Sequence, residues 1–235
     1  MKTKPGSRKK SELANNTADA VAAPSYHHGD LRNALIAAGR AALEELGPRE
    51  LSLRSVATAV GVSEAAPSRH FAGKDGLLAA MAAQGFSELA EKRKLIAALD
   101  ETPEEIVRAM MAEYVRFAQK HKGLFNLMVG PRIIQPTSYP ELKESTATSF
   151  KLFSSAVCSF GRAYDWPDSS LNLLVHAAWA VEHGLATLIL GGRAPASSFP
   201  VPINDMINFS ISIFIERVIA GPEFWGQENL IASAN

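Results

Sequence analysis

The sequence predicts an all-α protein in which a small helix-turn-helix domain of three helices precedes a larger helical domain. Three observations support this fold class. Apolar residues recur at the three- and four-residue spacing of amphipathic helices, capping residues and Gly-Pro pairs mark the expected helix ends, and residues 52–74 have the composition of two short helices joined by a tight turn.

The chain opens with a basic segment. Five of the first ten residues are Lys or Arg and none is acidic, and a polar, Ala-rich stretch without apolar periodicity continues to about Ser25. Residues 1–25 are therefore expected to be a disordered basic arm that reaches for nucleic-acid phosphates or the minor groove. The alternative is a solvated tail that only aids solubility.

A first helix is expected to start near Asp30 and to end at Gly47-Pro48. Its inward stripe follows helical spacing and consists of Leu31, Leu35, Ala38, Ala42 and Leu46. This helix would lie behind the two short helices and hold them at their angle.

Residues 52–63 carry the turn pattern. Ser52 is placed to cap a helix whose inward residues include Ala57, which is small where a second helix crosses. Gly61 supplies a left-handed backbone, Val62 fills the corner and Ser63 is placed to cap the second helix. The pattern predicts a helix-turn-helix that enters a DNA major groove; the alternative is an ordinary helix hairpin in a helical core.

The DNA contacts follow from this placement. Glu64, Ala65 and Arg69 have the chemistry to read base edges, because Arg pairs with guanine, Glu with cytosine and Ala with a thymine methyl. The expected phosphate contacts are Arg54, Ser68, His70 and Lys74. Arg69 could instead form a surface ion pair, and His70 could pack at the domain junction.

Within this segment Pro67 and Phe71 are expected to face the core. Pro67 would lie about four residues into the second helix, where proline is unfavourable.

Helices fill the rest of the chain. A long helix begins near Lys74, and Thr102-Pro103 starts another that runs to about Lys120. Further helices are expected near 124–129, 140–164, 167–191 and 203–220. Ile211–Glu216 alternates as a strand would, but the spacing of Ile207, Ile211, Phe214 and Val218 is helical and no partner strand is evident. These elements divide the chain into a helix-turn-helix domain at 26–73, a ligand-binding and dimerisation domain at 74–221 and a tail at 222–235.

The larger domain is rich in Met and aromatic residues, as suits a pocket for a small apolar or aromatic ligand, although such residues more often form plain core. His176, Trp179 and His183 share one helical face, where they offer too few ligands for a metal. We expect no metal and no cofactor. The expected pocket residues are Met110, Tyr114, Phe117, Phe125, Met128, Phe153, Trp179 and His183.

Composition indicates the class of protein to which the chain belongs but not its function. It has no net charge at pH 7 and is 47% hydrophobic, without a signal-peptide pattern at its start. The longest apolar run, Leu171–Leu190, contains Glu182 and His183, which disfavour a membrane span. The single Cys158 is consistent with a reducing compartment and is expected to be a buried small residue, with a redox sensor as the alternative. A cytoplasmic location without membrane contact is expected.

The helices near 167–191 and 203–220 are apolar on more than one face, which predicts a homodimer through them. Two recognition helices would then address half-sites about 34 Å apart, or further if the dimer is wide. The operator should be near-palindromic.

Several motifs resemble the TetR/AcrR-type transcriptional regulators. They are Tyr-His-His-Gly-Asp-Leu at 26–31, Gly-Val-Ser at 61–63, Arg-His-Phe at 69–71 and Lys74 followed by Gly76-Leu77-Leu78. The segment 178–186 resembles the Trp and His-Gly motif of one C-terminal branch. The resemblance implies phosphate contacts by His70 and Lys74 and dimerisation through a four-helix bundle. The family usually has a Tyr, which commonly contacts the DNA backbone or a base, where this chain has the shorter Ser68.

The sequence therefore predicts a ligand-responsive transcriptional regulator, a repressor that binds double-stranded DNA as a homodimer and is released by an unidentified small effector. Two alternatives stay open. One is a degenerate family member that binds a ligand or protein instead of DNA. The other is an all-helical enzyme, which the lack of a nucleophile elbow, phosphate loop or convincing carboxylate pair disfavours.

Overall fold

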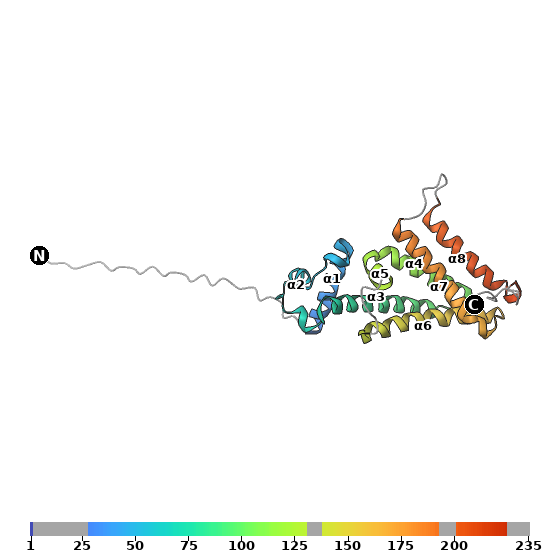
Figure 1. The fold of residues 1–235 in the computed structure, drawn as a ribbon, viewed down its shortest axis with the longest axis horizontal. Coiled ribbons are helices and arrows are strands. Elements are labelled where there is room, and N and C mark those ends of the chain that lie inside the picture. The colour runs from blue at the N-terminus through green and yellow to red at the C-terminus, as the bar shows by residue number, and fades with distance from the viewer. Residues whose placement is uncertain (2–27, 131–137, 193–200, 225–235) are drawn as a thin grey trace, which may run out of the picture.

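The computed structural model describes Met1 and residues 28–130, 138–192 and 201–224 (Figure 1). The predicted basic arm, Met1 apart, and the predicted tail after residue 224 lie outside the described residues. The all-α fold class is confirmed. In chain order the elements are α1 (His28–Glu50), α2 (Leu53–Val60), the 3-10 helix η1 (Pro67–Arg69), α3 (Gly73–Ala97), α4 (Pro103–Lys120), α5 (Lys122–Val129), α6 (Pro140–Ala163), α7 (Asp168–Gly191), α8 (Ile203–Ile219) and the 3-10 helix η3 (Pro222–Phe224).

Local capping chemistry sets several of the helix ends. The Ser52 side chain accepts a hydrogen bond from the Ser55 amide at 3.0 Å and so begins α2. Gly61 ends that helix with φ 77° and ψ 30°, in the left-handed region that glycine adopts without strain. At α4 the Thr102 side chain accepts from the Glu105 amide at 3.4 Å. These three ends agree with the sequence prediction.

The predicted inward stripe of α1 is partly wrong. Leu35 is fully buried, but Leu46 is 55% exposed, and the other large buried side chains of α1 are Ile36 and Leu43. The reason is that α1 packs against both α3 and α5, so its buried stripe is rotated relative to the one expected from spacing alone. Gly47, at φ 78°, kinks the chain where the helix was expected to end.

Helix α3 connects the N-terminal helices to the rest of the molecule. Its 25 residues give a length of about 37 Å at 1.5 Å per residue. Helix α6 lies along it, and this is the most extensive helix pairing among the described residues (Figure 1). Any change in the position of α3 relative to α6 therefore also moves the small helices at its N-terminal end.

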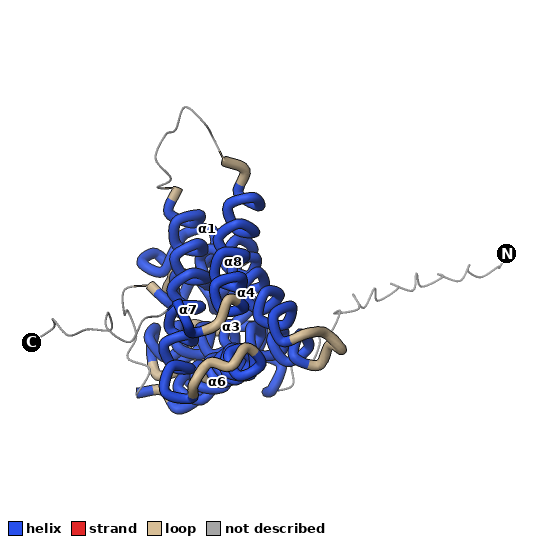
Figure 2. Tube along the Cα trace, turned by 90° about the vertical axis from the view of Figure 1, so that its right-hand side faces the viewer, coloured by secondary structure: helices blue, strands red, loops and turns tan. Residues whose placement is uncertain are grey.

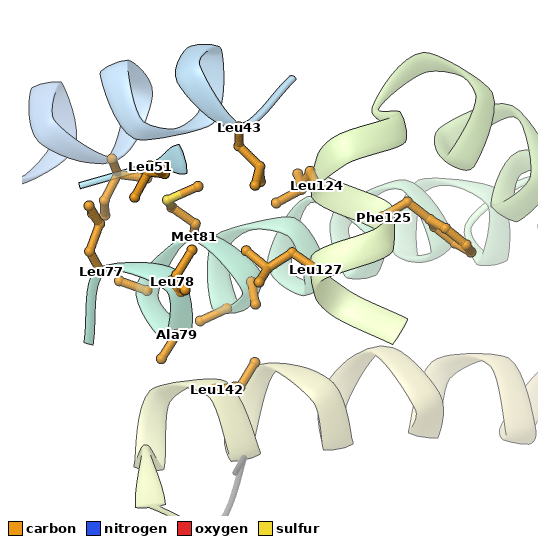
Figure 3. Packing of buried hydrophobic residues seen from close by; sticks show 14 of the residues in the cluster. Leu43, Leu51, Leu77, Leu78, Ala79, Met81, Leu124, Phe125, Leu127 and Leu142 are labelled. Carbon is orange, nitrogen blue, oxygen red and sulfur yellow. The ribbon is translucent and has the colours of Figure 1, made fainter. Parts of the chain in front are cut away.

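One hydrophobic cluster spans the N-terminal helices and the body. It combines residues of α1, α3, α5 and α6, and Figure 3 shows Leu43 of α1 facing Leu124 of α5, with Met81 of α3 beside them and Leu142 of α6 on the other side of α3. Because the cluster is continuous, α1 and α2 are held to the body by apolar burial as well as by the chain connection.

A second cluster joins α4, α6, α7 and α8, and Figure 2 shows α7 and α8 side by side. Ile207, Ile211, Phe214 and Val218 of α8 are buried, as the helical reading of that segment predicted. By length and composition α7 could cross a membrane, and among the described helices it alone passes that test. It also holds the buried Glu182 and packs on three other helices, as the core helix of a helical domain does.

Candidate nucleic-acid interface and ligand cavity

The segment after Gly61 differs from the predicted second helix. Residues 63–66 form a turn, closed by a hydrogen bond from the Ala66 amide to the Ser63 carbonyl at 2.9 Å, and η1 follows from Pro67. Proline has no N–H, so residue 67 cannot donate the bond to Ser63 that an α-helix starting there requires. The prediction that Ser63 caps an α-helix is therefore wrong. Pro67 is the first residue of η1, a position that tolerates proline.

The side chains of this segment divide between core and solvent. Pro67 is buried, and Phe71 is only 6% exposed. The residues between Gly61 and His70 that were predicted to contact DNA are all exposed. Burial of Pro67 and Phe71 on one side of the segment therefore leaves these residues on its solvent-facing side. We call this set the reading surface; it consists of Ser63, Glu64, Ala65, Ser68 and Arg69.

Arg54 and Glu64, both predicted DNA contacts, are paired with each other. The Arg54 Nε lies 3.0 Å from the Glu64 carboxylate, and the two side chains are 78% and 62% exposed. Such an exposed pair contributes little to stability, so either group is free to exchange its partner for DNA. The pair also holds the Glu64 carboxylate close to α2.

Lys74 has a structural partner that the sequence did not suggest. Its Nζ donates to the Arg49 carbonyl at 2.9 Å, which ties the start of α3 to the end of α1. Gly73, at φ 70°, makes the turn that precedes this contact. A phosphate contact by Lys74 would therefore share the ammonium with this carbonyl.

His70 is half-buried at the junction between the small helices and the body. The centroid of its ring lies 6.3 Å from that of the Phe71 ring. The Arg32 guanidinium lies over the Phe71 ring, 5.7 Å from its centroid. Arg32 also donates to Glu141 of α6 at 2.7 Å. The surroundings of His70 thus include groups from α1, α3 and α6.

A cavity of about 510 Å³ lies between α3, α4, α5, α6 and α7, within the size range of small-molecule sites. Four of the eight predicted pocket residues line it: Tyr114, Met128, Trp179 and His183. His176 lines it too. The remaining walls are mainly apolar and come from α3, α5, α6 and α7; they include Phe86, Leu89, Leu127, Leu142 and Phe150.

The other four predicted pocket residues are core residues instead. Met110, Phe117, Phe125 and Phe153 are fully buried or nearly so and do not line the cavity. Helical spacing shows which residues face inward, but it does not distinguish a side facing a neighbouring helix from a side facing a hollow. That distinction depends on how the helices pack.

Two charged residues of the cavity wall were missed by sequence reasoning. Arg93 of α3 and Glu182 of α7 are 3% and 0% exposed, and the Arg93 Nη2 donates to the Glu182 Oε1 at 2.9 Å. Arg93 also donates to the Ser149 carbonyl of α6 at 3.0 Å and lies 4.7 Å from the Phe153 ring centroid. The available signal was a lone carboxylate inside the apolar run of α7, since buried acids are rare without a partner.

Burial dominates the acid–base behaviour of this region. It raises the pKa of Glu182 from 4.5 to about 8, although the Arg93 guanidinium opposes the shift. The Tyr114 hydroxyl lies 3.0 Å from the His183 Nδ1. Burial raises the pKa of Tyr114 above its usual range and lowers the pKa of His183, so both groups are neutral at pH 7.

Two protein-family models match the chain. The model described as bacterial regulatory proteins of the tetR family matches residues 35–81, which include α2 and the reading surface. The model described as the tetracyclin repressor-like C-terminal domain matches residues 107–207. No curated protein is similar enough to be matched. The branch suggested by the motif at 178–186 stays a prediction.

Solved structures agree with the family models. A protein of unknown function from Rhodococcus sp. RHA1 has a TM-score of 0.71 and 31% identity, over 83% of this chain and 98% of its own. The TetR family transcriptional regulator PfmR from Thermus thermophilus has a TM-score of 0.59 and 15% identity, over 77% and 97%. A TetR/AcrR family regulator from Thermobifida fusca has a TM-score of 0.59 and 18% identity, over 79% and 97%.

The last two structures share the fold with this chain at low identity. The two family models together cover more than half of the sequence, one over the small N-terminal helices and one over the larger helical body. The chain therefore belongs to the TetR family of bacterial regulatory proteins, which are DNA-binding transcription regulators rather than enzymes.

Proposed function

We propose that this protein is a cytoplasmic, ligand-responsive repressor that binds a near-palindromic operator as a homodimer and is released by a small apolar or aromatic effector. Residues 26–73 would read DNA, and residues 74–221 would bind the effector and the second copy. The observation that carries the proposal is that one helix, α3, begins next to the reading surface and forms a wall of the 510 Å³ cavity.

The reading surface supports a division of roles on DNA. Arg69 is the longest exposed side chain of the surface, and within the described part of the chain it has no ion-pair partner, so it is assigned to a base edge. Glu64 and Ala65 are assigned to adjacent bases. Ser63, Arg54, Ser68, His70 and Lys74 are assigned to positioning contacts with the backbone.

The dimer proposal is supported by apolar side chains that the single chain leaves exposed on α7 and α8. Phe209 is 69% and Ile213 53% exposed, and a methyl group added at Gly184 would meet nothing within 4 Å in the described part of the chain. A second copy packed on this face would bury these groups and let two helices approach at the glycine. Leu173 and Leu188 extend the same exposed apolar side of α7.

Release follows from differential binding. An effector that fits the cavity better with α3 displaced relative to α6 and α7 would shift the population toward that arrangement and change the separation of the two reading surfaces. An effector with equal affinity for both arrangements would release nothing.

The proposal is tested by selecting duplexes from a random pool with the purified full-length protein and measuring affinity for the selected site as salt rises. We expect a steep loss of affinity with salt. Arg69→Ala is expected to lower the preference for the selected site over a scrambled one by about 5- to 150-fold, because one bidentate contact is worth about 1–3 kcal/mol. Lys74→Ala is expected to weaken both duplexes alike.

Lys94→Ala is the matched control, because Lys94 is an exposed lysine near the far end of α3. It should change neither value. Failure of the wild-type protein to bind any duplex while still binding small molecules would favour the degenerate family member over the repressor.

A further inference from the structure

The buried Arg93–Glu182 pair is bonded at one point where its chemistry allows two. The Arg93 Nη2 donates to the Glu182 Oε1, yet the Arg93 Nε and the Glu182 Oε2 have no hydrogen-bond partner among the described residues. Nε and Nη2 form one edge of a guanidinium, the edge that pairs with both oxygens of a carboxylate in a bidentate contact. The two unpartnered atoms are therefore the two that would form the second bond.

Leaving these atoms unpartnered is costly. A buried polar group without a partner destabilises the folded protein by about 1–3 kcal/mol, and by more when it is charged. Arg93 is held in place by the Ser149 carbonyl of α6 and by the Tyr114 and Phe153 rings. Glu182 is held by its place in the middle of α7. Arg93 and Glu182, the two residues whose second bond is missing, both line the cavity.

We propose that the effector carries a hydroxyl-type group that both donates and accepts hydrogen bonds, and that this group completes the pair by donating to the Glu182 Oε2 and accepting from the Arg93 Nε. The remainder of the effector packs as an apolar or aromatic body against Phe86, Phe150 and Trp179. This inference rests on the proposed function only in taking the cavity as the effector site.

A group that both donates and accepts suits this place for a further reason. It bonds to the Glu182 carboxyl whether that carboxyl is ionised or carries a proton. A purely apolar ligand would leave both buried atoms unpartnered. The polar group therefore selects the ligand class, while the apolar walls supply most of the contact area.

The test compares two ligands of nearly the same shape, 2-naphthylmethanol and 2-ethylnaphthalene, which differ by a hydroxyl in place of a methyl. Dissociation constants are measured by equilibrium dialysis with wild-type protein and with the double variant Arg93→Met/Glu182→Met. Replacing both members of a buried pair with apolar residues leaves no stranded charge, so the variant is expected to fold. Circular dichroism and thermal unfolding check that it does.

We expect the preference for the alcohol, taken as the ratio of the two dissociation constants, to be at least tenfold larger in the wild type than in the double variant. The control Glu91→Met/Lys94→Met removes an exposed pair from the same helix and should keep the wild-type ratio. Equal ratios in wild type and double variant overturn the inference. Failure of both ligands to bind the wild-type protein also overturns it. If the double variant does not fold, Glu182→Gln replaces it, and a Glu182→Gln protein with the wild-type ratio of dissociation constants overturns the inference.

DNA release is measured separately, with the selected duplex. An alcohol that binds with the expected preference but leaves the duplex bound supports this inference and contradicts the effector role in the proposed function. A wild-type protein that binds no duplex also contradicts the proposed function alone.

Discussion

At the residue scale, the most consequential side chains are the two buried ionisable ones that face each other, Arg93 and Glu182. A buried ion pair costs desolvation that its own attraction only partly repays, so Arg93 and Glu182 are poor devices for stability alone. Their position in the cavity wall, between α3 and α7, is consistent with a role in recognition.

Glu182 also makes stability depend on pH. Its pKa is raised to about 8 in the folded protein from 4.5, so between these values the unfolded chain loses the proton that the folded chain retains. The stabilisation linked to that proton is present at low pH and is lost as pH rises through this window. Glu182→Gln cannot ionise and lacks this dependence.

We therefore expect the free energy of unfolding of wild type, minus that of Glu182→Gln, to fall by up to about 1.4 kcal/mol per pH unit between about pH 5 and pH 8. Urea unfolding at three pH values and one protein concentration measures it. A difference that stays constant or rises with pH would contradict the raised pKa.

At the element scale, one helix caps another across the boundary between the small helices and the body. The Glu44 carboxylate of α1 accepts from the Gly123 amide at 2.7 Å and from the Leu124 amide at 3.1 Å, in the first turn of α5. These amides have no partner within their own helix, and the negative charge lies at the positive end of its dipole. The contact fixes α5 to α1 next to the packed side chains of Leu43 and Leu124.

Glu44→Ala is expected to destabilise the protein by about 1 kcal/mol, as loss of an N-cap does. Amide hydrogen exchange should also become faster at Gly123 and Leu124, because these two groups lose their acceptor. The neighbouring exposed Glu45→Ala serves as the control and should change neither measurement. Unchanged exchange at both amides in Glu44→Ala would mean that the cap does not form in solution.

At the scale of the whole molecule, two hydrophobic clusters hold the helices together. One joins α1 and α2 to α3 and α5, with residues of α4, α6 and α7, and the other joins α4, α6, α7 and α8. Helices α4, α6 and α7 belong to both, so the small helices and the proposed dimer face are connected through packed side chains. The exposed apolar residues of α7 and α8 lie on the side of the second cluster that the single chain does not cover.

Phe209→Lys is expected to convert the proposed dimer to a monomer, because it places a charge where an apolar side chain would be buried between two copies. Sedimentation velocity over a range of protein concentrations measures the change. Leu95→Lys is the matched control, since Leu95 is 71% exposed and belongs to α3 rather than to α7 or α8, and should leave the assembly unchanged. A Phe209→Lys protein with the mass of the wild-type assembly would place the interface elsewhere.

Sequence reasoning succeeded where the physical cause is local. Ser52, Gly61 and Thr102 act through bonds to residues only a few positions away, so the ends of α2 and α4 could be predicted from the chain alone. The same holds for the helices themselves, whose apolar spacing selects one face for burial. The error at Ser63 was local too, because Pro67 already ruled out the bond that an α-helix starting there needs.

By itself, then, the sequence determined the all-α fold class, the places where most helices start and end, and the turn at Gly61 that precedes the reading surface. Tertiary structure decided which inward-facing residues meet a neighbouring helix and which meet a hollow, and so separated Tyr114 and Trp179 of the cavity from Phe117 and Phe153 of the core. It alone brought Arg93 and Glu182 together, 89 residues apart in the chain. Contacts of that kind depend on the relative placement of whole helices, which periodicity within a single helix does not encode.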